Sequence, residues 1–244
     1  LNRGLLKDVE LLFNRKDREQ IIADFLKLSI KEVKKEMKTA TSNMAREWNY
    51  FKRKNKEIEF YIKTKGYIFE LEDWHIQDKM KQAGMIAIAS QAKNKKILEY
   101  GCGTADISFL AKKCGAKEVH ALDLSSKTLN FAKFKLRRLL TDLNKIRFIK
   151  APKNVNKLNL RKNYYDIITA EDVFEHMKDP KKHAKKIYDA LKEGGSLFFS
   201  TEYVHSNSHP MHLKSNERFN GVSWLYVLED LGFEIISPSQ AIKR

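Results

Sequence analysis

The stretch AEDVFEHM, residues 170–177, carries three carboxylates and one imidazole that could act together on a substrate. Asp172, Glu175 and His176 are spaced i, i+3, i+4, so on a helix they would share one face. Carboxylates and an imidazole can form half of a Mg²⁺ or Zn²⁺ site, and the same groups can transfer protons. Acids also stabilise the first turn of a helix without any chemistry. A metal site, an acid/base site and a purely structural role all stay open for this stretch.

Three further histidines, His205, His209 and His212, follow in a polar stretch. Histidine exchanges a proton near neutral pH and can act as a general base. We therefore predict that the catalytic residues are His176, His209 and His212. A divalent metal, if one is used, is expected to be bound by Asp172, Glu175, His176 and His209.

A second group of candidate residues surrounds the apolar run KILEY. This run contains Glu99 and leads into Gly101 and Gly103, and Asp123 ends the next apolar run. The G-x-G is too short for a dinucleotide fingerprint, and the phosphate-binding loop motif is absent. In open α/β sheets, ligands bind outside the carboxyl ends of the strands, so both acids should face one crevice. Asp123 is placed to accept hydrogen bonds from a ribose diol.

From residue 96 onward, short apolar runs alternate with amphipathic stretches of helical length. This alternation predicts βαβ units and an α/β fold with a Rossmann-like, doubly wound, mostly parallel sheet. The six expected strands are KILEY, EVHALDLS, IRFIKA, YYDIITAE, SLFFSTE and FEIIS.

The first 90 residues predict a helical extension that would form a lid over the crevice. Ser29 and Glu32 match the S-x-x-E capping box, which predicts a helix from Ile30 to about Phe51. Residues 57–74 are ambiguous between strand and helix, with a break at Gly66.

A further helix is expected over residues 78–93, with a helical period of apolar positions. We divide the chain into the N-terminal extension, residues 1–90, and the α/β domain, residues 91–244. The expected core positions of the 78–93 helix are Met80, Ala83, Ile86 and Ile88.

The composition sets broad limits on the class of protein. The formal net charge is +16, but the excess of Lys and Arg is spread over both halves of the chain, so charge alone does not identify a nucleic-acid partner. Hydrophobic residues make up 42%, which is ordinary for a globular protein, and no apolar run approaches the roughly 20 residues of a membrane span. Two cysteines without C-x-x-C spacing predict a reducing compartment, the cytoplasm.

The order of these motifs resembles that of the class I S-adenosylmethionine-dependent methyltransferases over residues 96–236. ILEYGCGTADIS is similar to their first motif, ALDLS to the second and YYDIITAEDVFEHMKDP to the fourth, and ALKEGGSLFFST is similar to the segment through strand five. The sequence departs from the family at Ala105, where a third Gly is usual, and near Pro152, where an Asp often meets adenine. The resemblance implies S-adenosylmethionine as cofactor, with a binding site made of Glu99, Gly101, Cys102, Gly103, Asp123, Leu124 and Glu171.

The pattern after strand four is similar to that of ubiquinone-pathway O-methyltransferases and of small-RNA 3′-terminal 2′-O-methyltransferases. These carry E-x-x-E-H and a later histidine, which together bind a divalent metal; the present D-x-x-E-H puts Asp172 first and implies Mg²⁺ or another divalent ion. Our first expectation is O-methylation of a small-molecule or glycan hydroxyl. One alternative is a metal-dependent RNA ribose 2′-O-methyltransferase, because residues 150–163 hold five basic and no acidic residues. The second alternative is a catalytically silent methyltransferase fold that serves as a binding subunit.

The end of the chain adds one structural expectation. The family usually ends with two strands, the last antiparallel beside strand five, but only PSQAIKR follows FEIIS. Pro238 cannot donate to a strand ladder, and an unpaired fifth strand would invite pairing with another chain. Together with Leu1 in the first position, this predicts a segment of a longer polypeptide, or an oligomer in which the missing strand comes from elsewhere.

Overall fold

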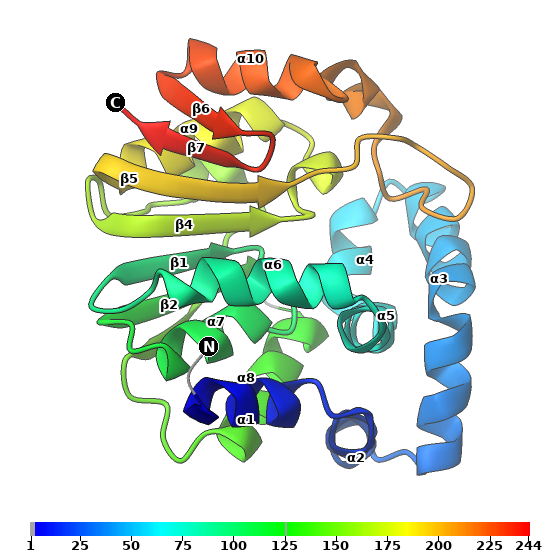
Figure 1. Ribbon diagram of the computed structural model, residues 1–244. Coiled ribbons are helices and arrows are strands. Elements are labelled where there is room, and N and C mark those ends of the chain that lie inside the picture. Colours follow the sequence, from blue (N-terminus) through cyan, green and yellow to red (C-terminus); the bar gives the residue numbers. More distant parts are fainter. Residues whose placement is uncertain (1–2, 125) are drawn as a thin grey trace.

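The computed structural model describes residues 3–124 and 126–244 and is built on one mixed sheet. The strand order is β3-β2-β1-β4-β5-β7-β6, with β1 to β5 parallel and β7 antiparallel to both its neighbours (Figure 1). This confirms the predicted doubly wound, mostly parallel α/β fold. The strands are β1 (Lys96–Tyr100), β2 (Glu118–Leu124), β3 (Ile146–Ala151), β4 (Tyr165–Glu171), β5 (Leu191–Ser200), β6 (Phe233–Ser237) and β7 (Gln240–Lys243).

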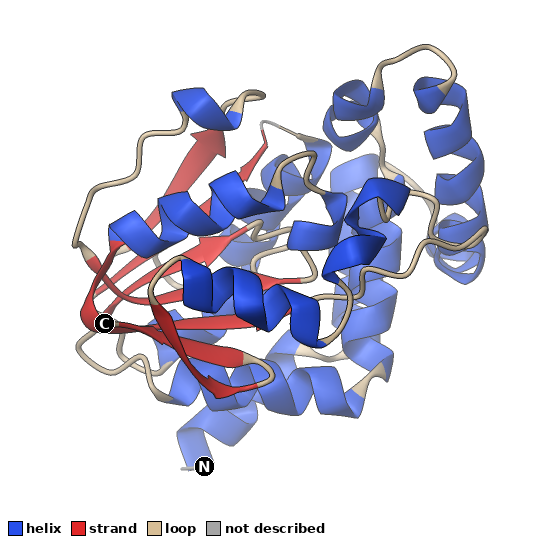
Figure 2. Ribbon diagram, turned by 90° about the horizontal axis from the view of Figure 1, so that it is seen from above, coloured by secondary structure: helices blue, strands red, loops and turns tan. Residues whose placement is uncertain are grey.

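Helices cover both faces of the sheet (Figure 2). Successive strand residues point to opposite faces: Ile97 lies in one apolar core and Leu98 in the other. The Ile97 face packs against α6 (Lys79–Ser90), α7 (Asp106–Lys113) and α8 (Lys127–Leu139). The Leu98 face packs against α9 (Pro180–Ala190) and α10 (Val222–Asp230).

The N-terminal part is helical, as predicted. Its elements before α6 are α1 (Arg3–Leu12), α2 (Arg15–Leu26), α3 (Ile30–Lys52), α4 (Glu57–Lys63) and α5 (Gly66–Gln77). The capping box of Ser29 and Glu32 is formed at the start of α3. The ambiguous residues 57–74 form α4 and α5, with a break at residues 64–65. Gly66 is the first residue of α5 and packs against Met44, whose Cγ would lie 2.2 Å from an added Cβ.

The expected core face of α6 is partly wrong. Met80 is 82% exposed, whereas Ile88 is buried as predicted. The buried positions of α6 are Gln82, Met85, Ile88 and Ala89. Gln82 lies on the buried face because its side-chain amide donates to the carbonyls of His75 and Ile76 in α5. With Gln82 on the buried face, Met80 faces solvent.

The expected absence of a last strand is also wrong. β7 pairs antiparallel with β5, for example Leu197 with Ala241, and with β6 on its other side. Pro238 and Ser239 form a two-residue turn between β6 and β7, where Pro238 has no ladder bond to make. Seven residues are therefore enough for the turn and the strand. No helix of residues 3–124 and 126–244 is long and apolar enough to cross a membrane.

Candidate active site

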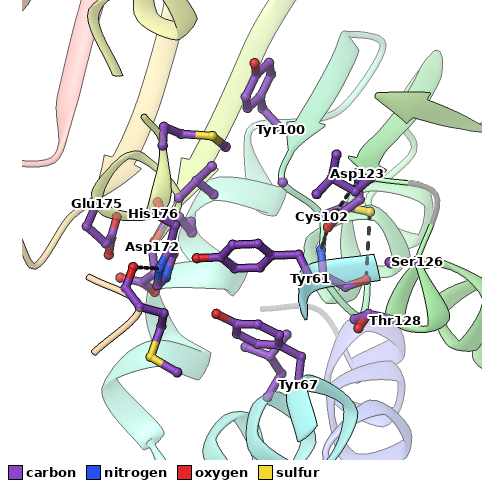
Figure 3. Close-up of a pocket in the computed structure, with 18 of the residues that line it drawn as sticks. Tyr61, Tyr67, Tyr100, Cys102, Asp123, Ser126, Thr128, Asp172, Glu175 and His176 are labelled. Atoms are coloured by element: carbon purple, nitrogen blue, oxygen red, sulfur yellow. Dashed lines mark hydrogen bonds between the residues drawn. The ribbon is translucent and has the colours of Figure 1, made fainter. Parts of the chain in front are cut away.

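A cavity of about 890 Å³ opens at the carboxyl ends of the parallel strands. The strand ends and the turns after them form its floor, and α3, α4 and α5 lie opposite, beyond the arrowheads of β4 and β5 (Figure 1). Its size is in the range of pockets that enclose small-molecule ligands. The residues predicted from the two sequence motifs meet in this cavity (Figure 3).

The turn after β1 brings the backbone close to its neighbours. Gly101 and Gly103 have φ of +71° and +48°. A Cβ on Gly101 would lie 2.5 Å from Cγ2 of Val173, and one on Gly103 would lie 2.8 Å from Cδ1 of Leu71. Ala105 also adopts the left-handed conformation, at φ +62°, where a third glycine would be unstrained. Positions 101 and 103 therefore require glycine, because the side chains of Val173 and Leu71 pack directly against the backbone of the turn.

Glu99 lies beneath this turn. It is 6% exposed and accepts hydrogen bonds from the amide and the hydroxyl of Ser108 in the first turn of α7, the amide at 2.9 Å. Burial raises the pKa of Glu99 to about 8. Glu99 therefore fixes the start of α7 and still lines the cavity.

Asp123 ends β2 on the same side of the cavity. Its Oδ2 accepts the amide N–H of Gly103 at 2.8 Å, and its Oδ1 accepts that of Leu124 at 2.6 Å. Burial raises the pKa of this carboxyl to about 6. Each oxygen keeps a second lone pair. The nearby hydroxyls of Thr104 and Thr128 are buried without a hydrogen-bond partner in the described part of the chain. These groups suit the hydroxyls and polar atoms of an adenosyl ligand.

Glu171 and Asp172 are held by a lysine that the sequence analysis missed. Nζ of Lys81, on α6, lies 3.0 Å from Glu171 and 2.5 Å from Asp172. Oγ of Ser200 lies 2.9 Å from an oxygen of each carboxylate and can donate its proton to either one. Burial lowers the pKa of Lys81, but Asp172 and Glu171 outweigh it, so that the pKa is raised. A lysine on an amphipathic helix has no sequence signature that would have identified this contact.

The remaining members of the AEDVFEHM stretch form a separate group. Phe174–His176 is a short 3-10 helix and Asp172 has φ +52°, so the stretch is not the continuous α-helix that would align all three side chains. Glu175, His176 and His212 instead place one ligand atom each within 4.8 Å of one another. His209 stacks on His212 with ring centroids 5.4 Å apart and lies outside this group.

Both histidines of the group have a defined tautomer. Nδ1 of His176 lies 3.2 Å from the carbonyl of Met211, and Nδ1 of His212 lies 3.0 Å from that of Val204. A carbonyl only accepts, so each Nδ1 carries the proton and each Nε2 keeps a free lone pair. Backbone carbonyls orient metal-binding histidines in the same way. This donor set fits a divalent cation.

Burial also sets the charge of these groups. It lowers the pKa of His176 to about 4, with His212 contributing, and lowers that of His212 as well. It raises the pKa of Glu175 to about 8, with Asp172 contributing. One oxygen of Glu175 has no hydrogen-bond partner in residues 3–124 and 126–244. Without a cation, the group therefore consists of neutral imidazoles and a largely protonated carboxyl at pH 7.

Aromatic side chains form the opposite wall. The rings of Tyr61 and Tyr67 stack 5.8 Å apart and lie 6.1 and 6.4 Å from that of His176. Figure 3 shows the phenol of Tyr61 directed toward His176 and Asp172, between them and the Asp123 side. Neither phenol oxygen, nor Nε1 of Trp48 behind them, has a hydrogen-bond partner in the described part. An acceptor molecule could supply these bonds.

A buried network of charges ties the N-terminal helices to the cavity floor. Arg18 of α2 contacts Glu72 of α5 and lies 2.9 Å from Asp106 of α7. Lys135 of α8 lies 2.6 Å from both carboxylates, and His75 lies 2.7 Å from Asp106. Arg18, Glu72, Asp106 and Lys135 are at most 1% exposed. Sequence analysis missed this network, because its members are up to 117 positions apart.

Comparison with known proteins identifies the family. A sequence model of the family described as "Methyltransferase domain" matches residues 73–237. Ubiquinone biosynthesis O-methyltransferase of Shewanella sp. (strain ANA-3) is 30% identical over 132 residues, 54% of this chain and 54% of that protein. Its counterpart in Nitrosospira multiformis is 32% identical over 119 residues, 48% of this chain and 47% of that protein. The chain spans about half the length of the curated relatives it matches.

Solved structures share the fold at lower identity. The cyclase SpnF is 19% identical, with a TM-score of 0.51 over 65% of this chain and 59% of that chain. Haemonchus contortus phosphoethanolamine N-methyltransferase 2, in complex with S-adenosyl-L-methionine, is 20% identical, with a TM-score of 0.50 over 64% of this chain and 39% of that chain. These likenesses show the fold alone, and the cyclase shows that the fold does not fix the reaction.

The family match covers well over half of the chain, and it agrees with the strand order and the turn at Gly101 and Gly103. The protein belongs to the class I S-adenosylmethionine-dependent methyltransferases and is related to the ubiquinone O-methyltransferases. This confirms the family predicted from the sequence motifs. The roles of individual site residues and the use of a metal stay predictions.

Proposed function

We propose that the protein transfers the methyl group of S-adenosylmethionine to a hydroxyl of a small-molecule acceptor. The observation that carries this proposal is the convergence of Glu175, His176 and His212 on one wall of the cavity, across from Asp123. The Asp123 side offers the remaining lone pairs of a carboxylate that the amides of Gly103 and Leu124 hold in place. The other side offers proton-accepting groups and aromatic surface for an acceptor.

The cofactor supplies an electrophilic methyl group when bound. Asp123, Thr104 and Thr128 would hold its adenosyl part, and the Gly101–Gly103 turn would line the same site. Much of the rate of such a transfer comes from holding the acceptor oxygen in line at near contact distance. Tyr61 and Tyr67 would position the acceptor ring beside His176.

The acceptor hydroxyl must lose its proton as the oxygen–carbon bond forms and the carbon–sulfur bond breaks. A general base works best when its pKa lies near the operating pH. Glu175, with a pKa of about 8 and a free oxygen, meets this condition better than His176, with a pKa of about 4. A divalent ion held by Glu175, His176 and His212 would instead lower the pKa of the hydroxyl itself.

An RNA acceptor fits this cavity less well than a small molecule. The acceptor wall combines aromatic rings with Glu70, whose carboxylate has no ion pair in the described residues and would repel the phosphates of a nucleic acid. A catalytically silent fold would not need a cofactor site with free hydrogen-bonding capacity at Asp123. We therefore favour small-molecule O-methylation over the two alternatives.

A methylation assay tests the proposal. With radiolabelled S-adenosylmethionine and panels of phenols, sugars and short RNAs, we expect methyl ethers of small hydroxyl compounds. Glu175→Gln should reduce turnover at least about a hundredfold, the scale of a lost acid–base group. His176→Ala should also reduce turnover, because His176 belongs to the same group of side chains. Activity that survives exhaustive EDTA treatment would reject the metal and leave Glu175 as base. Transfer to RNA alone would overturn the assignment of the acceptor class.

A further inference from the structure

The wall formed by α3, α4 and α5 contains a carboxylate without a counter-ion. Glu70 is partly buried, lines the cavity and accepts one hydrogen bond, from the hydroxyl of Thr41 at 3.0 Å. No ion pair within residues 3–124 and 126–244 involves Glu70. Burial raises its pKa, while Thr41 and the more distant His209 act in the opposite direction. A buried carboxylate without a cation is costly, so a ligand cation would complete this site.

Several other acids of the cavity are compensated by a cation or exposed to solvent. Lys81 neutralises Glu171 and Asp172. Lys178 lies 3.9 Å from Glu57 at the exposed rim. Glu202 is exposed to solvent, which screens its charge. Glu99, Asp123 and Glu175 also have no ion pair in the described residues, but they belong to the cofactor side and the proposed reaction centre, so Glu70 is the carboxylate without a cation on the wall formed by α3, α4 and α5.

Aromatic groups surround the approach to Glu70. Tyr67 precedes it by one turn of α5, so the two side chains lie on one face of the helix. Tyr67 stacks on Tyr61, and the Tyr61 ring lies 5.6 Å from that of Trp48. Trp48 is 1% exposed and lines the cavity, and its indole N–H has no partner in the described residues. Aromatic faces attract ammonium groups, and the indole N–H of Trp48 is a donor that a ligand oxygen could use.

The same wall leads toward the proposed reaction centre. The ring centroids of Tyr67 and His176 are 6.4 Å apart, so Tyr67 neighbours Glu70 on α5 and also the group of Glu175, His176 and His212. A ligand ring lying along Tyr67 would extend toward Glu70 at one end and toward His176 at the other.

We propose that the acceptor is a hydroxylated aromatic compound that carries a protonated amine. Its ammonium pairs with Glu70, its ring lies against Tyr67, and its hydroxyl faces His176 and Glu175. The proposal rests on the proposed function for the identity of that hydroxyl as the methyl acceptor. The amine itself takes no part in the transfer.

Binding of three matched phenols tests the proposal without any need for turnover. Tyramine, 4-ethylphenol and 4-hydroxyphenylacetate share the ring and the hydroxyl, but their arms are cationic, neutral and anionic. We expect calorimetry on the protein saturated with S-adenosylhomocysteine to show tyramine binding about tenfold or more tighter than 4-ethylphenol, the scale of a charge-assisted hydrogen bond. The anionic phenol should bind weakest.

Two variants test whether the preference for tyramine depends on Glu70. Glu70→Gln keeps the shape and the bond from Thr41 and should abolish the preference for tyramine. Glu193→Gln, whose side chain is 71% exposed, should retain it. Equal binding of tyramine and 4-ethylphenol by the wild type, or an unchanged preference in Glu70→Gln, would overturn the proposal. Failure of the wild type to bind S-adenosylhomocysteine would contradict the proposed function instead, so the two failures are distinguishable.

Discussion

At the scale of single residues, the cofactor side of the cavity depends on Asp123. Its two oxygens accept the amides of Gly103 and Leu124, which draws the turn after β1 and the end of β2 together. The same carboxylate has lone pairs left for a ribose diol. The Asp123 carboxylate therefore both holds the turn after β1 against the end of β2 and provides hydrogen-bond acceptors for the ligand.

Asp123→Ala should weaken the binding of S-adenosylmethionine by on the order of 1.5 to 3 kcal/mol, the contribution of hydrogen bonds to a charged group. Titration calorimetry measures this directly. Asp142→Ala is a matched control, because the Asp142 carboxylate lies in an exposed loop. Unchanged affinity in Asp123→Ala would refute the assignment of the ribose site.

Glu175 should make stability depend on pH. Its folded-state pKa of about 8 lies above the ordinary value near 4.3, so the folded protein binds more protons than the unfolded chain between these values. The free energy of unfolding therefore falls as the pH rises through this window. In EDTA, Glu175→Gln should stabilise the protein by roughly 4 to 5 kcal/mol at pH 8 and by only about 1 kcal/mol at pH 5.

Urea unfolding at both pH values measures this difference, with Glu193→Gln as the exposed control. If Glu175 binds a cation, added Mn²⁺ should stabilise the wild type and leave Glu175→Gln unaffected. A variant that loses stability at pH 8 in EDTA would show that the ionised carboxylate is favourable in the fold.

Residues in local motifs were predictable, and those brought together by distant chain segments were not. The turn at Gly101 and Gly103 was recognised because its conformation is dictated within a few positions. The metal ligands were predicted to include His209, but the structure groups His212 with Glu175 and His176, because loop geometry decides which imidazole faces them. Lys81 was missed because its contact with Asp172 spans 91 positions.

At the scale of elements, the charge network fixes α2 and α5 to α7 and α8. Arg18 and Lys135 compensate Glu72 and Asp106 in a site closed to solvent. Breaking a buried pair leaves an uncompensated charge, which is far more destabilising than the loss of an exposed pair. The network therefore determines where α5, and with it Tyr67 and Glu70, stands over the cavity.

Arg18→Met should lower the free energy of unfolding by roughly 3 to 5 kcal/mol, because Glu72 and Asp106 would share the single cation of Lys135. Arg15→Met is the control on the same helix. Arg15 pairs with Asp73 at 3.0 Å but is 42% exposed, so its loss should cost less than about 1 kcal/mol. Similar losses in the two variants, measured by urea unfolding, would contradict this account.

The sequence predicted which helices and strands form better than it predicted which face of a helix is buried. Alternating apolar runs gave six strands in order because burial on both faces of a parallel sheet leaves that pattern. The buried face of α6 was misjudged, since Gln82 points inward to backbone carbonyls and polarity alone placed it outside. The strand β7 was missed because four residues after a tight turn carry almost no periodic signal.

At the scale of the whole molecule, the N-terminal helices and the sheet share buried surface. Leu12 of α1 and Met85 of α6 lie in the same apolar cluster as Ile97 of β1 and Val119 of β2. The charge network adds a second connection through α2 and α5. A lid that unfolds independently would need a hydrophobic core of its own. Here one apolar cluster contains residues from both sides of residue 90, the predicted boundary of the N-terminal extension.

We therefore expect the whole chain to unfold in one cooperative transition. Its three tryptophans report on both parts: Trp48 lies in α3 and Trp74 in α5, whereas Trp224 lies in α10, in the core of the other sheet face. Trp224→Phe leaves only the helical reporters, and Trp48→Phe combined with Trp74→Phe leaves only Trp224. In each variant, the urea midpoint from fluorescence should equal the midpoint from far-ultraviolet circular dichroism, which is the test of two-state behaviour. If the helices formed an independent lid, the fluorescence of Trp48 and Trp74 would change at lower urea than the dichroism. Fluorescence and dichroism are compared within the same variant, so the effect of the substitution on stability cancels. Different urea midpoints for the two probes would therefore disprove the shared core.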